Sequence, residues 1–277
     1  MVSQAVDKSI APLSEQRIYR MTHLVQTEQN ALPTADLFPL TGLQPAIIAI
    51  DGPAASGKST VGYQLAQRTG FLFFDTGILY RAVTWAVLNA GVAPHDEAAV
   101  GRIAEQTNID IEAAGHHSDG RQNSVMVGQQ DVTWQIRTPE IDQNVSAIAA
   151  NALVRKALLV QQRRIALHYG NGRAEQPGII LVGRDIGTVV APEAPLKIYL
   201  NASAEERARR RFHEQEARGK SVNYAQVLED IYRRDKLDSE RALAPLRPAD
   251  DAIVIDTSTL STSQVIAQIL AAASGRA

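Results

Sequence analysis

Short apolar segments recur along the chain after Pro45, and each is uninterrupted and rich in β-branched or aromatic residues. Runs of this length that are apolar throughout are typical of strands with both faces buried. The predicted strands are 46–50, 71–74, 179–182, 196–200 and 252–255. Because strands buried on both faces are typical of parallel pairing, we expect one five-stranded parallel sheet.

Segments with apolar residues at helical spacing separate these predicted strands. The predicted helices are 61–70, with Gly70 as the stop, then 79–88, 148–167, 205–217, 224–238 and 263–273. Strands that alternate with helices are typical of a doubly wound α/β domain. The pattern therefore predicts the α/β class, with helices flanking the sheet.

Two intervals interrupt this alternation. Residues 91–145 contain short β-like pieces at 109–112, 124–127 and 131–133, separated by glycines, and they predict a small antiparallel subdomain. Residues 203–241 hold ten basic and nine acidic residues, a dense but nearly neutral mixture. Such a mixture favours a mobile, solvated flap over a nucleic-acid contact surface.

The first 44 residues differ from the rest of the chain. They carry mixed charge and end in a series of chain breakers, Pro33, Pro39, Gly42 and Pro45. Breakers at this spacing suit a linker. We therefore expect a flexible N-terminal extension over 1–44 and one folded domain over 45–277.

Length and composition exclude several classes of protein. The 277 residues suit one or two domains, and 45% hydrophobic with 21% charged residues is ordinary for a globular chain. The net charge of −2 gives no overall basic field for nucleic acid or an anionic membrane. The chain has no cysteine, which excludes disulfides and thiolate chemistry.

The sequence shows no pattern typical of a membrane span or of a secretion signal. Apolar runs stay far below the roughly 18 residues of a membrane span, and the first thirty residues lack a secretion signal. We therefore expect a cytoplasmic monomer with neither a membrane nor a nucleic acid as partner.

The segment that follows the first predicted strand matches a phosphate-binding motif. Gly52-Pro-Ala-Ala-Ser-Gly-Lys-Ser59 fits G-x-x-x-x-G-K-[ST] and opens a predicted helix, which is the context that the motif requires. Its backbone N–H groups and the helix N-terminus suit phosphate oxygens. Lys58 is expected to reach the β- and γ-phosphates, and the Ser59 hydroxyl to bind Mg²⁺. The predicted ATP-binding residues are Gly52, Pro53, Ala54, Ala55, Ser56, Gly57, Lys58, Ser59 and Thr60.

The class of nucleotide-using protein follows from further motifs. D-x-x-G and N-K-x-D of switch GTPases and the L-S-G-G-Q signature of transport ATPases do not occur. A small-molecule kinase remains, and it must bring an anionic acceptor against a triphosphate. Arginines suit this task because their planar fork binds phosphate oxygens in pairs. The candidates are Arg81, Arg137, Arg155, Arg184, Arg234 and Arg241.

Several of these residues lie in segments that together resemble one family. Asp75-Thr-Gly-Ile-Leu-Tyr-Arg81, Ile136-Arg-Thr138, Gly183-Arg-Asp-Ile-Gly-Thr-Val-Val190 and Arg234-Asp-Lys-Leu-Asp-Ser-Glu-Arg241, with the motif at 52–59, are similar to bacterial cytidylate kinases over about 46–273. The resemblance implies a nucleoside monophosphate kinase with an acceptor-binding subdomain at about 91–145 and a helical lid at about 203–241. It implies transfer of the ATP γ-phosphoryl group to CMP and dCMP, with Mg²⁺.

The resemblance also assigns residues to parts of the acceptor. Thr76, Arg155 and Asp185 would face the cytosine, whose amine donor and ring acceptor suit a carboxylate and a fixed cation. Ser146, Arg234 and Asp238 would lie near the sugar, and Arg81, Arg184 and Arg241 near the acceptor phosphate. The expected catalytic set is Lys58, Arg184, Asp185 and Arg241, and Arg137 joins the substrate-binding set. Arg234, Asp238 and Arg241 are expected to share one helix face.

The chain departs from the family at one position and leaves alternatives open. Val182 stands where many relatives have an acid, so the acid near Mg²⁺ is open between Asp51 and Asp185. Arg209, Arg210 and Arg211 could reach the donor phosphates. Trp85 and Trp134 stand at apolar positions and are expected to be packing groups rather than base-stacking groups. A UMP/CMP-type or other small-molecule kinase is the alternative function, and a non-enzymatic nucleotide-binding module is the remote one.

Overall fold

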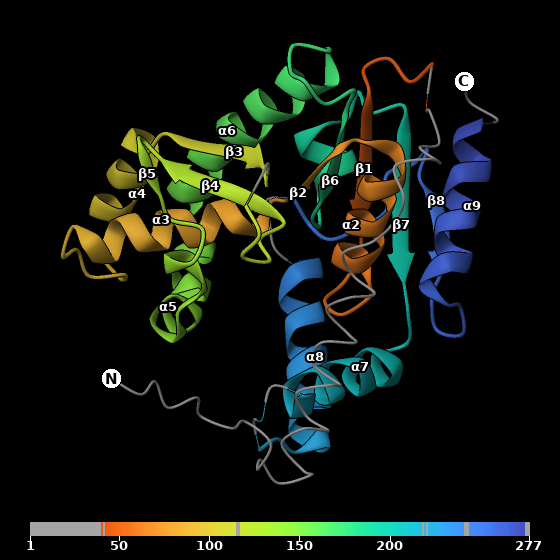
Figure 1. Ribbon diagram of the computed structural model, residues 1–277. Helices are drawn as coiled ribbons and strands as arrows, with labels where there is room; N and C mark the ends of the chain where they lie inside the picture. The colour runs from red at the N-terminus through yellow and green to blue at the C-terminus, as the bar shows by residue number, and fades with distance from the viewer. Residues whose placement is uncertain are drawn as a thin grey trace, which may run out of the picture. The chain divides into compact units, whose positions relative to one another are not determined.

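A five-stranded sheet forms the centre of the computed structural model, which describes residues 40, 42–114, 117–217, 219, 221–240 and 244–274. The strands run in the order β2-β6-β1-β7-β8, and every neighbouring pair is parallel (Figure 1). They are β1 (Ile47–Asp51), β2 (Leu72–Asp75), β6 (Ile179–Val182), β7 (Leu196–Asn201) and β8 (Ile253–Asp256). The five predicted strands and the α/β class are confirmed.

Alternate residues of the strands enter two separate cores, one on each face of the sheet. Ile47 and Ala49 of β1 belong to the core beneath α3, α4 and α6, whereas Ile48 and Ile50 belong to the core beneath α2 and α9. All four side chains are fully buried. Burial on both faces explains why these strands read as uninterrupted apolar runs.

Most helices lie where the apolar spacing predicts them. They are α2 (Lys58–Thr69), α3 (Gly77–Asn89), α7 (Ala204–Ala217), α8 (Tyr224–Glu240) and α9 (Thr262–Ser274). Gly70 ends α2 with a left-handed backbone, φ +74°, and its N–H donates to the carbonyl of Ala66. A glycine adopts this cap without the cost that a side chain would bring, so the predicted stop is confirmed.

The predicted helix 148–167 is wrong as a single element. The structure has α5 (Pro139–Ala150) followed by α6 (Ala152–Gly170), and Asn151 separates them. The Asn151 side chain accepts a hydrogen bond from the N–H of Leu153 at 2.8 Å, which caps α6. Apolar residues continue across the cap, so their spacing alone hides the break.

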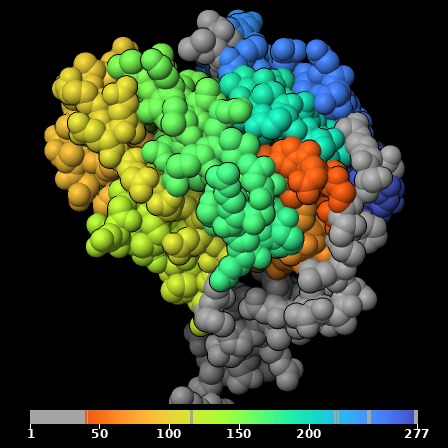
Figure 2. All heavy atoms as spheres, turned by 90° about the horizontal axis from the view of Figure 1, so that it is seen from above, coloured from red at the N-terminus to blue at the C-terminus, as the bar shows by residue number. Residues whose placement is uncertain are grey.

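The insertion at 91–145 contains the predicted antiparallel sheet and also helices that were not predicted. The sheet is β3 (Ile109–Ala113), β4 (Asn123–Val127) and β5 (Gln130–Asp131). The additional elements are α4 (Glu97–Gln106), a 3₁₀ turn η1 (Gln135–Arg137) and most of α5. Figure 2 shows the insertion, in yellow and yellow-green, against the green atoms of α6.

The helical pair α7 and α8 is less solvated than its charge density predicts. Arg207 of α7 is only 4% exposed, and its guanidinium pairs with Asp235 of α8 at 2.5 Å. The expected solvated face is therefore wrong at this residue. Residues 1–39, and with them most of the predicted N-terminal extension, lie outside the described residues. Within the described ranges, no helix combines the length and apolar character that a bilayer crossing requires.

Candidate active site

The segment that leads from β1 into the first turn of α2, which we call the phosphate loop (residues 52–60), is shaped by glycine. Gly52 has φ +146°, and a Cβ there would lie 2.0 Å from the carbonyl oxygen of Leu200, so a larger residue cannot fit. Gly57 has φ +91° and forms the N-cap of α2. The loop thus turns from the carboxyl end of a central strand directly into a helix N-terminus, where N–H groups and the helix dipole favour anions.

Lys58 lies inside this loop and is 7% exposed. Its Nζ donates to the carbonyl oxygen of Pro53 at 2.6 Å and to Ser56 Oγ at 3.4 Å. Burial, followed by the charge of Arg184, lowers the pKa of Lys58 to about 7, while Asp75 and Asp51 act in the opposite direction. An anion at the loop would therefore strongly favour the charged form of this lysine.

A hydroxyl and a carboxylate meet beside the loop. Ser59 Oγ donates to Asp75 Oδ2 at 2.9 Å, and Asp75 Oδ1 accepts the N–H of Gly77 at 3.0 Å. Oxygen donors of this kind fit Mg²⁺, which uses one or two carboxylates with substrate phosphates and keeps several waters. Among the described residues there is no cluster of three or more His, Cys, Asp or Glu side chains that could hold a metal alone.

The residue before Gly183 contributes packing here. Val182 is 1% exposed, and its methyl group packs over Gly62 of α2, where a Cβ would lie 2.7 Å from it. The Val182 carbonyl oxygen accepts the Thr76 hydroxyl at 3.1 Å, which fixes that side chain at the end of β2.

Arg184 links the sheet to the helical pair. It follows β6, and its Nε donates to Asp238 of α8. Asp238 also lies 3.9 Å from Arg234 on the same helix, so one carboxylate holds two guanidinium groups near Lys58. Helix α8 ends at Glu240 and Arg241 lies outside the described residues, so the expected shared face is seen only for Arg234 and Asp238.

Arg155 and Asp185 form a second pair close to Arg184. Arg155 of α6 donates to Asp185 Oδ2 at 3.4 Å, and its guanidinium lies 5.9 Å from the centre of the Tyr80 ring. Both partners of the ion pair are about one fifth exposed, at 18% each. The pair therefore presents a carboxylate and a cation side by side at an accessible position.

The remaining acceptor candidates come from α3 and the insertion. Arg81 donates to Asp142 at 2.7 Å and to the carbonyl of Ile136 at 3.1 Å. Arg137 lies close enough to feel the charge of Arg81, and its guanidinium is 5.4 Å from the centre of the Trp134 ring. Ser146 is exposed on α5, the helix that supplies Asp142.

Trp134 does not pack in the interior as expected. The side chain is 44% exposed, and its indole N–H donates to Asp119 at 2.9 Å. Asp119 thus holds the indole N–H edge of the ring, and the Arg137 guanidinium lies over the ring. The expectation for Trp85 fits better, because this residue packs partly buried against the core.

The helical pair also contacts the phosphate loop. Arg207 Nη1 donates to the carbonyl of Ala54 at 3.3 Å. Arg210 Nη1 donates to the Thr257 hydroxyl at 3.0 Å, and that hydroxyl donates in turn to the carbonyl of Ser56 at 3.1 Å. Arg209 and Arg211 instead pair with glutamates of their own helix.

Comparison with known proteins decides the family. The model of the cytidylate kinase family matches residues 48–275. The chain belongs to the cytidylate kinase family. The cytidylate kinase of Bacillus pumilus is 45% identical over 226 residues, which are 82% of this chain and 95% of that protein. The cytidylate kinase of Stutzerimonas stutzeri is 44% identical over 230 residues, covering 83% and 96%.

A two-part protein belongs to the same family. The bifunctional pantoate ligase/cytidylate kinase of Synechococcus elongatus is 45% identical over 235 residues, which are 85% of this chain but only 43% of that protein. Family membership confirms the resemblance that the sequence motifs predict, and it makes the chain an enzyme of the cytidylate kinase type.

Three residues beside the phosphate loop were not among the site residues predicted from the sequence. Asp75 was quoted only as part of a motif, although its place directly after a buried strand puts it at the edge where the loop lies. Arg207 and Thr257 reach the loop from positions far away in the sequence. The phosphate-binding motif at 52–59 gives no indication that Arg207 and Thr257 contact the loop.

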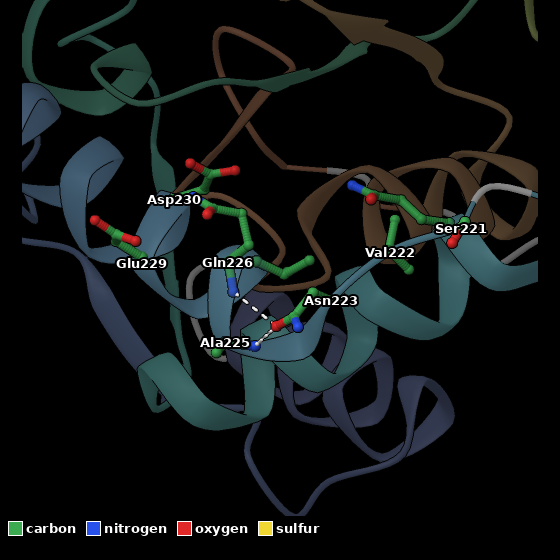
Figure 3. Close-up of a pocket in the computed structure, with 9 residues that line it drawn as sticks. Ser221, Val222, Asn223, Ala225, Gln226, Glu229 and Asp230 are labelled. Carbon is green, nitrogen blue, oxygen red and sulfur yellow. Dashed lines mark hydrogen bonds between the residues drawn. The ribbon is translucent and has the colours of Figure 1, made fainter.

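A pocket of about 520 Å³ is lined by residues of α7, of α8 and of the segment that joins them (Figure 3). It is formed where α7 and α8 meet, and its lining includes Gln215, Val222 and Asp230 but no predicted site residue. Asn223 accepts the N–H of Ala225 at 2.8 Å and thereby caps α8 beside the pocket. The chemistry of the cytidylate kinase family is therefore better sought at the phosphate loop than in this pocket.

Proposed function

We propose that the chain transfers the γ-phosphoryl group of ATP to CMP and dCMP, which yields ADP and CDP or dCDP. The observation that carries this proposal is the placement of Lys58 beside Arg184 and Arg234 at the carboxyl edge of the sheet. Lys58 belongs to the phosphate loop, whereas Arg184 comes from the turn after β6 and Arg234 from α8. A donor and an acceptor phosphate can thus be held at one place.

The donor side consists of the phosphate loop and its lysine. The N–H groups at the start of α2 bind the phosphate oxygens, and Lys58 turns its ammonium from Pro53 to the β- and γ-phosphates. Ser59 and Asp75 would hold Mg²⁺ together with phosphate oxygens. When bound, this ion neutralises charge on the β- and γ-phosphates.

The acceptor side consists of arginines from separate elements. Arg81 and Arg137 bind the acceptor phosphate from α3 and the insertion, and Arg184 binds it from the turn after β6. Arg234 and Asp238 hold the sugar hydroxyls from α8, and Ser146 does so from α5. Arg241 lies outside the described residues, and the family resemblance assigns it to the acceptor phosphate.

The base is recognised by the pair Arg155 and Asp185, with the Thr76 hydroxyl nearby. Asp185 accepts the exocyclic amine of cytosine, and Arg155 donates to its ring acceptor. Uracil offers the reverse pattern and leaves both side chains without a matching partner. Each unmatched buried group costs about 1 to 3 kcal/mol. Both side chains are 18% exposed, so we expect the lower end for each, about 2 kcal/mol together, or a preference of about 30-fold.

The chemical step is an in-line displacement. An oxygen of the acceptor phosphate attacks the γ-phosphorus while the bond to the β-phosphate oxygen breaks, and no covalent enzyme intermediate forms. Lys58 and Arg184 stabilise charge on the transferred group, which is most of what a protein can contribute to this reaction. Asp185 orients the acceptor through the base.

An acceptor panel tests the proposal. ADP release from ATP is measured with CMP, dCMP, UMP, AMP and GMP, and we expect CMP and dCMP to be the best substrates by at least tenfold. Equal rates with UMP would instead assign a UMP/CMP-type kinase. ATP binding with no transfer to any of the five would assign a nucleotide-binding module and overturn the proposal.

A further inference from the structure

A buried carboxylate joins the phosphate loop to the turn that carries Arg184 and Asp185. Asp51 is the last residue of β1, directly before Gly52, and it is 4% exposed. Its Oδ1 accepts the N–H of Ile186 at 2.8 Å, and its Oδ2 accepts the N–H of Gly187 at 2.8 Å. One side chain thus bridges segments that are 135 residues apart.

The segment held by Asp51 is an irregular one. After β6 the chain makes a turn at 183–185 and enters a single π-helical turn, η2 (Ile186–Val190). Asp51 accepts the first two N–H groups of η2, which no hydrogen bond within the helix can satisfy. The start of the turn is fixed by the Gly183 N–H, which donates to the Ile50 carbonyl at 3.0 Å, and Asp51 fixes its other end, directly after Asp185.

The neighbourhood is built around the carboxylate. A Cβ at Gly187 would lie 3.1 Å from Lys197 Cδ, which is a tight contact, and 3.5 Å from Asp51 Oδ2, which is an ordinary one, so both side chains pack against this backbone. Burial raises the pKa of Asp51 to about 6, while the two N–H donors favour its charged form. An apolar side chain would avoid this desolvation but could not accept the two hydrogen bonds.

We infer that Asp51 is a positioning residue that sets the Arg184–Asp185 turn in register with the phosphate loop. The inference rests on the proposed function, because it concerns the residues placed on the acceptor side. Asp51 itself acts through backbone contacts, since both of its oxygens accept N–H groups and the side chain is buried. Its loss should misplace the acceptor and leave ATP binding intact.

Asp51→Asn and Asp51→Ala test this role. Asparagine keeps the size and one acceptor but turns an amide N–H₂ toward the second N–H, and alanine removes both acceptors. We expect kcat with CMP to fall at least tenfold and the KM for CMP to rise, while the KM for ATP stays within twofold. Amide hydrogen exchange at 186 and 187 should become faster in both variants.

Ile47→Val is the matched control, because it removes one methylene from the buried part of the same strand. It should lower thermal stability, but it should not lower kcat or raise the KM for CMP relative to the KM for ATP. The inference is overturned if folded Asp51→Asn keeps both kcat and the KM for CMP within twofold of the wild type. It is equally overturned if Ile47→Val shows the same kinetic split.

Gly187→Ala covers the case in which the Asp51 variants do not fold. It leaves the carboxylate in place and crowds Lys197 Cδ, which packs against the same backbone, so the turn must shift away from Asp51 and we expect kcat with CMP to fall. Unchanged CMP kinetics in this variant would also contradict the inference. A wild-type enzyme that transfers no phosphate to CMP would instead refute the proposed function, so the two failures can be told apart.

Discussion

The proposed donor and acceptor halves of the site obtain their residues in different ways. The phosphate loop is one contiguous segment, fixed by the close approach of Gly52 to the Leu200 carbonyl and by Lys58 within it. The acceptor half gathers side chains from α3, η1, α6, the turn after β6 and α8. Phosphate binding by the loop therefore depends strongly on the single residue Lys58. In the acceptor half, the positive charge is spread over several arginines.

Lys58→Met should have the largest effect, because it breaks the donor half at its one buried cation. We expect kcat to fall by about 10²- to 10³-fold, since a positioned charge is lost from the transition state. The fold should survive, because methionine fills the space without a buried charge. Steady-state kinetics and thermal unfolding check both points.

The control for this variant is Lys156→Met, at an exposed position of α6. It should keep kcat within twofold of the wild type. If Lys58→Met shows the same small change, the donor role of this lysine is contradicted.

Lys58 also predicts a pH signature of the donor half. Its pKa of about 7 in the free protein leaves it mostly neutral at pH 8, and bound phosphates favour the charged form. ATP binding at pH 8 should therefore take up close to one proton, and the uptake should shrink toward pH 6. Calorimetry in buffers of different ionisation enthalpy measures this number, and no uptake at pH 8 would contradict it.

Arg184→Lys should have the next largest effect, on the acceptor half. Lysine keeps the charge but loses the fork that pairs with Asp238 and phosphate oxygens. We expect kcat/KM for CMP to fall by about 10²-fold with little change in the KM for ATP.

Arg163→Lys is the control for the Arg184 variant. Arg163 pairs with Glu193 at 3.2 Å and has no place in the proposed site. Its kinetics should match the wild type. An equal rise of the ATP and CMP KM values in Arg184→Lys would contradict the division into two halves.

Arg155→Met sharpens the comparison at the base. It removes the cation that pairs with Asp185, so the ratio of kcat/KM for CMP to that for UMP should fall about tenfold. Arg164→Met on the same helix removes an exposed pair with Asp110 and should leave the ratio unchanged. A ratio that stays constant in Arg155→Met would remove this residue from base recognition.

Trp134→Ala should have the smallest effect. The ring contacts Arg137 only through a cation–π interaction worth about 0.5 to 1 kcal/mol at an exposed site. The KM for CMP should rise about two- to fivefold at constant kcat, and Trp134→Phe should restore part of it. Equal KM values in the wild type and Trp134→Ala would show that Arg137 needs no aromatic support.

The features that the sequence predicts correctly have local causes. The strands are readable because both faces are buried, and the stop at Gly70 because a left-handed cap suits glycine. The break at Asn151 and the helix α4, capped by Asp96, were missed because a cap within apolar or alanine-rich sequence leaves the spacing unchanged. The buried position of Arg207 depends on Asp235, a partner 28 residues away.

The same distinction holds within the site. The phosphate loop could be read from contiguous residues, and the arginines from their type and from the family resemblance. The hydrogen bond between Ser59 and Asp75 and the contacts of Asp51 join segments that only the fold brings together. Spacing along the chain carries no information on such contacts.

The most direct test of the central claim follows the transferred group itself. The protein is incubated with CMP and ATP labelled at the γ-phosphate, and the products are separated within one turnover. We predict that the label appears in the β-phosphate of CDP in a one-to-one ratio with ADP. Label released as inorganic phosphate, with no labelled CDP, would contradict the claim that donor and acceptor meet at this edge of the sheet.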